Sequence, residues 1–355
     1  MGRKKRARLV FKIFSGLIAC LILFLVLEIT QRVLDYRSGR FVQSEDAVQA
    51  RKYSIFVASD DPIQIYEARP DYVKGGIRYT ESSGILRPDD VPAVKPAQDF
   101  RIAVLGDSIT MASIWRYEDR YTSLLETQLN ADPPAGGKAF QVLNFAVDGY
   151  RTIQEARRLE RTAIQFDPDL VVLQYCLNDP GSSNTPTVWF QDPPVPPLSH
   201  LFDLVLSRLR LLHYDARRTE YVPVVGPGQM EADYWYRLYE PDEKSWKTVV
   251  EGFQRIAACA KTRNAPVLLV IWPFFLEEGW LSGGSGAFHD QVSKAGRAVG
   301  FEILDLIEAF RDHSVFDLRE RAGDIFHPNL KGHQMAAKAI ESKVRSMMGN
   351  APRSP

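Results

Sequence analysis

From Phe100 onward, short continuous apolar runs alternate with longer segments whose apolar residues recur at helical spacing. A run of four to eight apolar residues has the length of a buried strand, whereas the longer period is typical of an amphipathic helix. Strands that alternate with helices predict an α/β fold with a parallel sheet. The expected strands are residues 100–105, 140–146, 170–175, 267–272 and 301–304, and the clearest helices are 242–264 and 287–299.

Two helices of this region have recognisable starts. Thr152 and Glu155 have the spacing of a capping box, in which two side chains satisfy the first free N–H groups of a helix. Asn329 is the expected cap of the last helix. The helix from Thr152 is expected to end before Asp167-Pro168. Its predicted apolar face consists of Ile153, Ala156, Leu159, Ala163 and Phe166.

The amino terminus has a different pattern, with six basic residues among the first twelve and no charge from Ile13 to Leu27. Residues 9–27 are just long enough to span a bilayer, and Lys12 can extend to the headgroups. The basic flank predicts a cytoplasmic N-terminus and a domain on the far side of the membrane. A cleaved signal peptide and a lipoprotein box ending at Cys20 are the alternatives. Nothing resembling a cleavage site follows, so we expect an uncleaved single-pass anchor in the cytoplasmic membrane, with the catalytic domain periplasmic or extracellular.

These patterns divide the chain into a basic tail with an anchor at 1–28, an extension at 29–99, a large domain at 100–348 and a flexible tail at 349–355. Within the extension, 28–53 is the expected helical stalk and 54–99 an irregular segment packed on the domain. Residues 180–241 hold nine of the 22 prolines and form an expected insertion. There, Ser199 is expected to cap a helix through Leu212, whose apolar stripe fits core packing, a lid or membrane contact.

Charge and cysteine content exclude some classes of protein. The formal net charge is zero, so the residues after the first twelve sum to minus six, which argues against a nucleic-acid partner. Two of the three cysteines, Cys176 and Cys259, lie outside the apolar N-terminal segment, in a predicted strand and a predicted helix. We expect both to be buried, unpaired thiols rather than a disulfide framework.

Gly106-Asp107-Ser108 ends the strand at 100–105, at the sheet edge where open α/β proteins bind ligands. Taken alone, Ser108 fits a helix cap as well as a nucleophile. A nucleophilic serine needs a base that is itself oriented by a third group. Asp324 and His327 have the spacing to supply both.

Attack by a serine on an acyl carbon also creates an oxyanion, which needs fixed hydrogen-bond donors. The backbone N–H groups of Ser108 and Gly149 and the side-chain amide of Asn178 are the candidates. A metal site is the rival explanation for the histidines. Because no carboxylate or cysteine cluster has metal-ligand spacing around His327 and His333, we expect neither a metal nor another cofactor.

With these residues in order, the chain resembles the SGNH/GDSL hydrolase superfamily from about residue 101 to the last helix. Four blocks carry the resemblance: Gly106-Asp107-Ser108, Gly149 after Asn144, Asn178-Asp179, and Asp324-x-x-His327. The resemblance implies a flavodoxin-like three-layer α/β/α sandwich with a five-stranded parallel sheet. It implies a triad of Ser108, Asp324 and His327, oxyanion donors at Ser108, Gly149 and Asn178, and supporting roles for Asp107 and Asp179. One departure is Cys176, which stands where the third block usually has glycine.

Three functions fit these residues. The first is a membrane-anchored serine esterase that removes acyl groups, for example acetyl groups from a cell-envelope carbohydrate. The second is an O-acyltransferase with the same triad, in which a sugar hydroxyl replaces water. The third, a catalytically inactive binding or scaffold protein, is disfavoured because binding alone requires no such set of residues. The sequence does not identify the acyl group, the alcohol or the oligomeric state.

Overall fold

The protein is described by a computed structural model of residues 2–37, 45–133, 139–181, 190, 197–208, 238–275 and 285–349. The chain forms two compact units, residues 1–52 with 188–220, and residues 53–187 with 221–355. Part of the expected insertion, residues 188–220, therefore groups with the N-terminal helix. The sequence pattern alone predicts that all of 180–241 belongs to the large domain.

The larger unit is built on a parallel sheet of five strands in the order β6-β5-β7-β8-β9. This arrangement confirms the predicted fold class. The second strand ends at Asn144 rather than at residue 146, because the Ala146 N–H bonds to the Asn144 side-chain oxygen at 3.0 Å. The strands are β5 Asp99–Leu105, β6 Ala139–Asn144, β7 Leu170–Cys176, β8 Val267–Trp272 and β9 Glu302–Asp305.

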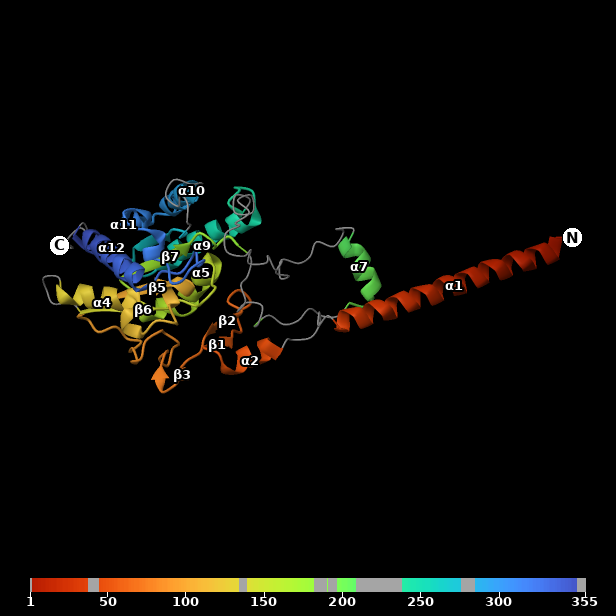
Figure 1. Ribbon diagram of the computed structural model, residues 1–355, viewed down its shortest axis with the longest axis horizontal. Helices are drawn as coiled ribbons and strands as arrows, with labels where there is room; N and C mark the ends of the chain where they lie inside the picture. The colour runs from red at the N-terminus through yellow and green to blue at the C-terminus, as the bar shows by residue number, and fades with distance from the viewer. Residues whose placement is uncertain are drawn as a thin grey trace. The chain divides into compact units, whose positions relative to one another are not determined.

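Helices cover both faces of this sheet (Figure 1). One face carries α4 Tyr121–Ala131 and α12 Leu330–Gly349, which pack together, with the short α11 Ile307–Phe310 beside α12. The other face carries α5 Thr152–Arg161, α9 Lys244–Lys261 and α10 Ser285–Ala298. Every residue of β7 and β8 is buried, as expected for central strands covered on both faces. Short 3₁₀ turns lie at Tyr117–Asp119, Ala163–Phe166 and Val315–Asp317.

The start of α5 differs from the prediction. The Thr152 hydroxyl donates to Asp179 Oδ2 at 2.6 Å, and Gln154 Oε1, not Glu155, accepts from the Arg151 N–H at 3.2 Å. The proposed Thr152–Glu155 capping box is therefore wrong. Polar residues of α5 are buried together with the apolar ones, because the helix packs against α9 and also bonds to the segment that precedes the sheet. These buried polar residues are Gln154, Glu155 and Arg158.

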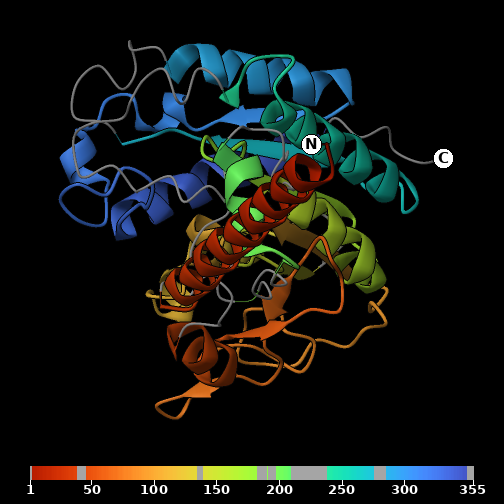
Figure 2. The same cartoon turned by 90° about the vertical axis from the view of Figure 1, so that its right-hand side faces the viewer.

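Residues 54–99 contain two small antiparallel hairpins that the sequence analysis missed. The first pairs β1 Phe56–Ala58 with β2 Tyr66–Ala68, and the second pairs β3 Val73–Lys74 with β4 Ile77–Arg78. Gly75 and Gly76 have φ angles of 59° and 78°, which suit the two-residue turn between β3 and β4. Figures 1 and 2 show this orange extension at the end of the unit opposite α10.

The smaller unit contains α1 Gly2–Arg37, α2 Glu45–Tyr53 up to residue 52, and α7 His200–Arg208. Among the described residues, Val10–Arg37 is the one helix long and apolar enough to cross a membrane. The helix α1 continues past the predicted boundary at residue 28. The expected stalk is helical at both ends, and residues 38–44 lie outside the described part.

The helix α7 packs on α1 through polar groups. The Glu28 carboxylate accepts hydrogen bonds from the Ser199 hydroxyl at 2.8 Å and from the His200 and Leu201 N–H groups at 3.0 and 2.9 Å. The Ser199 hydroxyl accepts from the Phe202 N–H at 3.1 Å, as predicted for a helix cap. Of the predicted apolar stripe, Val205 is exposed and Leu201 and Leu204 are only partly buried, so these residues do not form a buried core in this unit. The rest of that predicted helix, residues 209–212, lies outside the described residues.

Candidate active site

Ser108 is the first residue of the short helix α3, Ser108–Met111, directly after β5. The cap of this helix is Asp107, whose Oδ1 accepts from the Ile109 N–H at 2.9 Å. Ser108 is thus not the cap, and its Oγ faces His327. A side chain at Gly106 would overlap the Thr110 hydroxyl and the Gln174 side-chain oxygen, so only glycine fits this close turn.

His327 bonds on both sides of its ring. Its Nε2 lies 2.8 Å from Ser108 Oγ, and its Nδ1 lies 3.0 Å from both carboxylate oxygens of Asp324. Asp324 Oδ1 also accepts from the backbone N–H groups of Phe326 and His327, which holds the loop in shape. Because a carboxylate accepts from Nδ1–H, the Nε2 lone pair is directed at the serine hydroxyl.

Electrostatics around this pair favour a charged Asp324 and a basic His327. Burial would raise the pKa of Asp324, but hydrogen bonds from the His327 ring and from two backbone N–H groups hold that pKa well below its usual range. Burial would lower the pKa of His327. The hydrogen bond and charge of Asp324, together with the charges of Asp107 and Asp148, outweigh burial and raise that pKa.

The three predicted oxyanion donors border the same pocket as Ser108 and His327. Gly149 has a φ of 75°, a backbone conformation that residues other than glycine rarely adopt. Among the described residues, the backbone N–H groups of Ser108 and Gly149 donate no hydrogen bond. Asn178 Oδ1 is buried and likewise has no partner in this part of the chain. Two unused backbone donors therefore border the pocket beside the serine.

Asp107 and Asp179, the two predicted supporting residues, are buried. Burial raises the pKa of Asp107 to about 6, against the opposing hydrogen bond from the Ile109 N–H. Burial, and then the charge of Asp107, raises the pKa of Asp179 well above its usual range. The Asp179 N–H donates to the Cys176 carbonyl at 3.0 Å, so Asp179 closes the turn that carries Asn178.

The cysteines partly match the prediction. Cys176 is a buried free thiol at the end of β7, and the Asn178 turn follows it without a glycine. Cys259 is also a free thiol, but it is half-buried rather than buried, because α9 places it at the border of its packed face.

The pocket has a volume of about 400 Å³. Its wall includes groups that the sequence analysis did not select, notably Trp115, Asp148 and His333. Trp115 follows Ser108 by seven residues, and its indole packs edge-on against His333 at 6.0 Å. Burial, then the charges of Arg120 and His327, lowers the pKa of His333 to about 3, so this ring is neutral. Further charged residues of the wall are Arg151, Glu320 and Arg321.

One group of potential metal ligands lies in the described residues, namely Glu320, Asp324 and His327, whose ligand atoms lie within 4.8 Å of one another. Glu320 was not among the residues predicted from the sequence, because its spacing from His327 matches no ligand pattern considered there. The fold brings it close because the Glu320 N–H donates to the His327 carbonyl at 2.9 Å. Both His327 ring nitrogens already have protein partners, so this cluster is accounted for without an ion.

Comparison with known proteins identifies the family of this chain. The GDSL-like Lipase/Acylhydrolase family matches residues 104–335, as the sequence resemblance predicted. No curated protein matches the chain. Similar solved structures include LAE5, an alpha/beta hydrolase enzyme from the metagenome of Lake Arreo, Spain, with 19% identity, a TM-score of 0.43, and coverage of 68% of this chain and 94% of that one.

Two further structures are similar. Axe2, an acetylxylan esterase from Geobacillus stearothermophilus, has 15% identity, a TM-score of 0.44, and coverage of 69% of this chain and 94% of that one. EstA, a psychrotrophic esterase from Pseudoalteromonas sp., has 15% identity, a TM-score of 0.42, and coverage of 71% of this chain and 100% of that one. Likeness at this level carries no conclusion about the substrate.

Proposed function

Because the chain belongs to the GDSL-like lipase/acylhydrolase family and is an SGNH-type esterase, we propose that it is a membrane-anchored serine esterase acting on an acylated cell-envelope carbohydrate. Ser108 is the nucleophile in this proposal, His327 the base and Asp324 the residue that orients it. The observation that carries the assignment is the 2.8 Å contact between His327 Nε2 and Ser108 Oγ, with Asp324 on the other ring nitrogen.

The reaction takes place in two steps. In the first, Ser108 Oγ attacks the acyl carbon while His327 Nε2 takes the hydroxyl proton, and His327 then returns this proton to the leaving alcohol. In the second, water attacks the acyl carbon while His327 Nε2 takes a proton from it, and His327 then returns this proton to Ser108 Oγ as the bond between the acyl carbon and the serine oxygen breaks and the acid leaves. The charge of Asp324 stabilises the imidazolium formed in each step, which agrees with the raised pKa of His327.

Each step passes through a tetrahedral oxyanion. In the part of the chain that the structure describes, the N–H groups of Ser108 and Gly149 have no acceptor and can donate to it, and the side-chain amide of Asn178 borders the same pocket. Donors fixed in advance stabilise this charge without reorganising, which is typically the largest contribution in such enzymes.

The walls of the pocket support a substrate rich in hydroxyl groups. Asp148 and Glu320 supply carboxylate acceptors, and Arg151 and Arg321 supply donors, so alcohols are well matched there. Trp115 adds a flat apolar surface beside these groups. A long acyl chain would need a deep apolar pocket, whereas the pocket formed by the described residues is lined mostly by polar residues, so we propose a short acyl group such as acetyl.

The helix α1 supports a location at a membrane. An 18-residue window within Val10–Arg37 has a mean hydropathy of 2.7, and the large apolar side chains of this helix are exposed. Basic residues lie on the amino-terminal side of this helix. We therefore propose that the helix is a retained anchor, with the N-terminus of the protein in the cytoplasm and the catalytic domain on the other side of the membrane.

A fluorophosphonate probe tests the nucleophile, and a screen of acylated sugars and lipids tests the substrate. Wild-type protein is expected to be labelled at Ser108 and to release acetate from an acetylated oligosaccharide, whereas Ser108→Ala does neither. Faster appearance of acylated sugar than of free acid, after a sugar acceptor is added, would indicate an O-acyltransferase. Absence of labelling in folded protein would contradict both assignments.

A further inference from the structure

The extension before the sheet contacts the loop that carries Gly149. Tyr66, the first residue of β2, donates its hydroxyl to the Asp148 carbonyl at 2.7 Å. In the opposite direction, the Tyr150 hydroxyl donates to the Tyr66 carbonyl. The two rings meet edge to face with centroids 5.4 Å apart, and both side chains are buried. Tyr66 therefore holds the residues on both sides of Gly149.

The bond to Asp148 has a geometric consequence for Gly149. The carbonyl of Asp148 and the N–H of Gly149 belong to one planar peptide unit, and in a trans peptide they point in opposite directions. A donor that fixes the carbonyl direction therefore also fixes the direction of the N–H. This control matters at Gly149, because glycine permits many backbone conformations and its N–H has no acceptor among the described residues.

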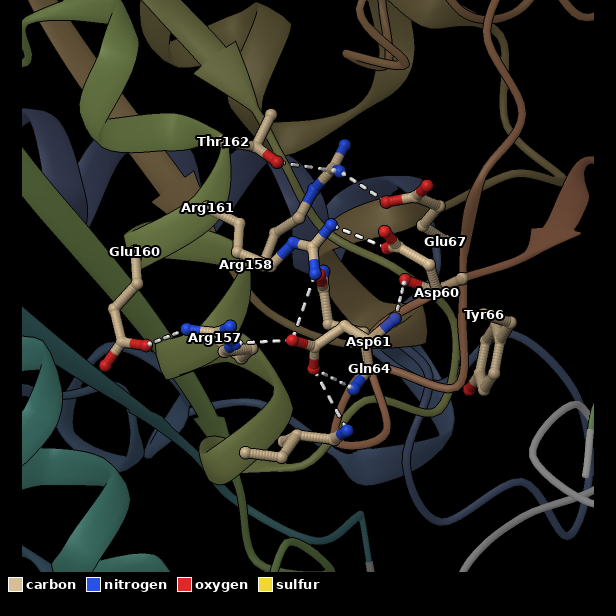
Figure 3. Close-up of polar contacts among 12 residues, drawn as sticks. Asp60, Asp61, Gln64, Tyr66, Glu67, Arg157, Arg158, Glu160, Arg161 and Thr162 are labelled. Atoms are coloured by element: carbon tan, nitrogen blue, oxygen red, sulfur yellow. Dashed lines mark hydrogen bonds and ion pairs between the residues drawn. The ribbon is translucent and has the colours of Figure 1, made fainter.

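The hairpin that carries Tyr66 is tied to α5 (Figure 3). The buried Asp61 carboxylate accepts from Arg157 Nε at 2.7 Å and from Arg161 Nη1 at 3.1 Å. The same carboxylate accepts from the Ile63 and Gln64 N–H groups and so shapes the turn between β1 and β2.

A second set of bonds links this turn to the start of α5. Gln154 Nε2 donates to the Gln64 carbonyl at 3.1 Å, and Gln64 Nε2 donates to the Tyr150 hydroxyl at 3.3 Å. Because α5 begins two residues after Tyr150, the hairpin and the Gly149 loop are anchored to the same helix. The position of the Tyr66 hydroxyl relative to the loop is thereby fixed.

We propose that Tyr66 is a positioning residue, whose hydroxyl fixes the Asp148–Gly149 peptide so that the Gly149 N–H points at the oxyanion. This inference rests on the proposed esterase function. If the proposal holds, residues 54–68 contribute to catalysis and are not merely a spacer between the anchor and the sheet. A purely structural Tyr66 would satisfy a buried carbonyl and influence stability alone.

The decisive variant is Tyr66→Phe, which keeps the ring contacts with Phe56 and Tyr150 and removes the hydroxyl. We expect kcat per titrated active site to fall roughly 10- to 100-fold, approaching the loss seen when an oxyanion donor is removed, with KM changed by less than about threefold. The matched control is Tyr72→Phe. It removes a tyrosine hydroxyl that bonds to the Tyr53 carbonyl, elsewhere in the extension, and should leave kcat unchanged.

Several outcomes would overturn the proposal. An unchanged kcat in Tyr66→Phe with a lower melting temperature would show a structural role, as would equal losses in both tyrosine variants. If Tyr66→Phe does not fold, Asp61→Asn weakens the bonds that position the hairpin while the Tyr66 hydroxyl is retained; we expect kcat to fall in this variant, and an unchanged kcat counts against the proposal. Failure of the wild type to react with a fluorophosphonate would contradict the esterase function instead.

Discussion

His327 Nε2 lies 2.8 Å from Ser108 Oγ, although the two residues are 219 positions apart in the chain. The serine follows β5, an interior strand of the sheet, and the histidine lies on the loop before α12. The carboxyl ends of parallel strands lie at the same edge of a sheet, and the loop places the His327 imidazole at this edge. The contact supports the triad assignment and leads to measurable expectations.

Replacement of Asp324 by asparagine should remove the charge that orients His327. We expect Asp324→Asn to lower kcat by up to about 10⁴-fold, because an amide favours the wrong imidazole tautomer. Circular dichroism should stay close to that of the wild type, because the asparagine oxygen can still accept from the Phe326 and His327 N–H groups. The matched control is Asp312→Asn, an exposed aspartate in the same region, which should keep full activity.

Replacement of Asn178 by alanine tests the oxyanion site. If its amide donates to the oxyanion, Asn178→Ala should cost about 2.7 to 4 kcal/mol of transition-state stabilisation, with a smaller change in KM. Ser108 should still be phosphonylated to completion. A normal kcat combined with a lower melting temperature would reduce Asn178 to a packing role.

The activity should depend on the ionisation of His327. A general base acts in its neutral form, and the pKa of His327 is raised above its usual 6.5. We therefore expect kcat/KM to increase with pH along a limb whose midpoint lies above 6.5. In Asp324→Asn the main group that raises this pKa is gone, so NMR titration of the His327 ring should give a lower midpoint. An unmoved midpoint would argue that other charges set the pKa.

Asp61 should stabilise the fold in a pH-dependent way. Burial opposes its ionisation, but bonds from Arg157, Arg161 and two backbone N–H groups lower its pKa from 3.8 to about 2. The folded state therefore gains stability above pH 3.8, and this gain disappears as the pH falls through 2. Asp61→Asn should lower the unfolding free energy by about 2 kcal/mol at pH 7 and by much less near pH 2.

Urea unfolding at the two pH values measures this difference. The matched control is Asp60→Asn, because Asp60 also pairs with Arg161, at 2.6 Å, but is largely exposed. An exposed ion pair contributes little to stability, so this variant should resemble the wild type at both pH values. Equal losses in the two variants would show that burial of Asp61 is not the cause.

The anchor proposal predicts the fate of α1. The full-length protein should resist carbonate extraction and keep its N-terminal residues, and protease added to spheroplasts should digest the domain that follows α1. A mature chain starting at a lipid-modified Cys20, or a protected carboxyl terminus, is the contrary result.

Local patterns in the sequence determined the elements of the large domain. Mainly apolar runs mark β7 and β8 because strands covered on both faces bury mostly apolar side chains, and the structure confirms both strands at or within one residue of the expected positions. The four motif blocks identified the family for a similar reason. Each lies in a short loop whose chemistry is encoded within a few residues, as in Asp324 and His327.

Only the tertiary structure decided which distant groups meet. Tyr66 and Asp148 are 82 positions apart, and no periodic pattern records a hydroxyl that bonds to a backbone carbonyl. Thr152 and Glu155 have the spacing of a capping box, yet the Thr152 hydroxyl donates to Asp179 instead. This different partner is available because α5 is buried on two sides. Sequence periodicity reports the face that an element buries, whereas such contacts depend on how the elements pack in three dimensions.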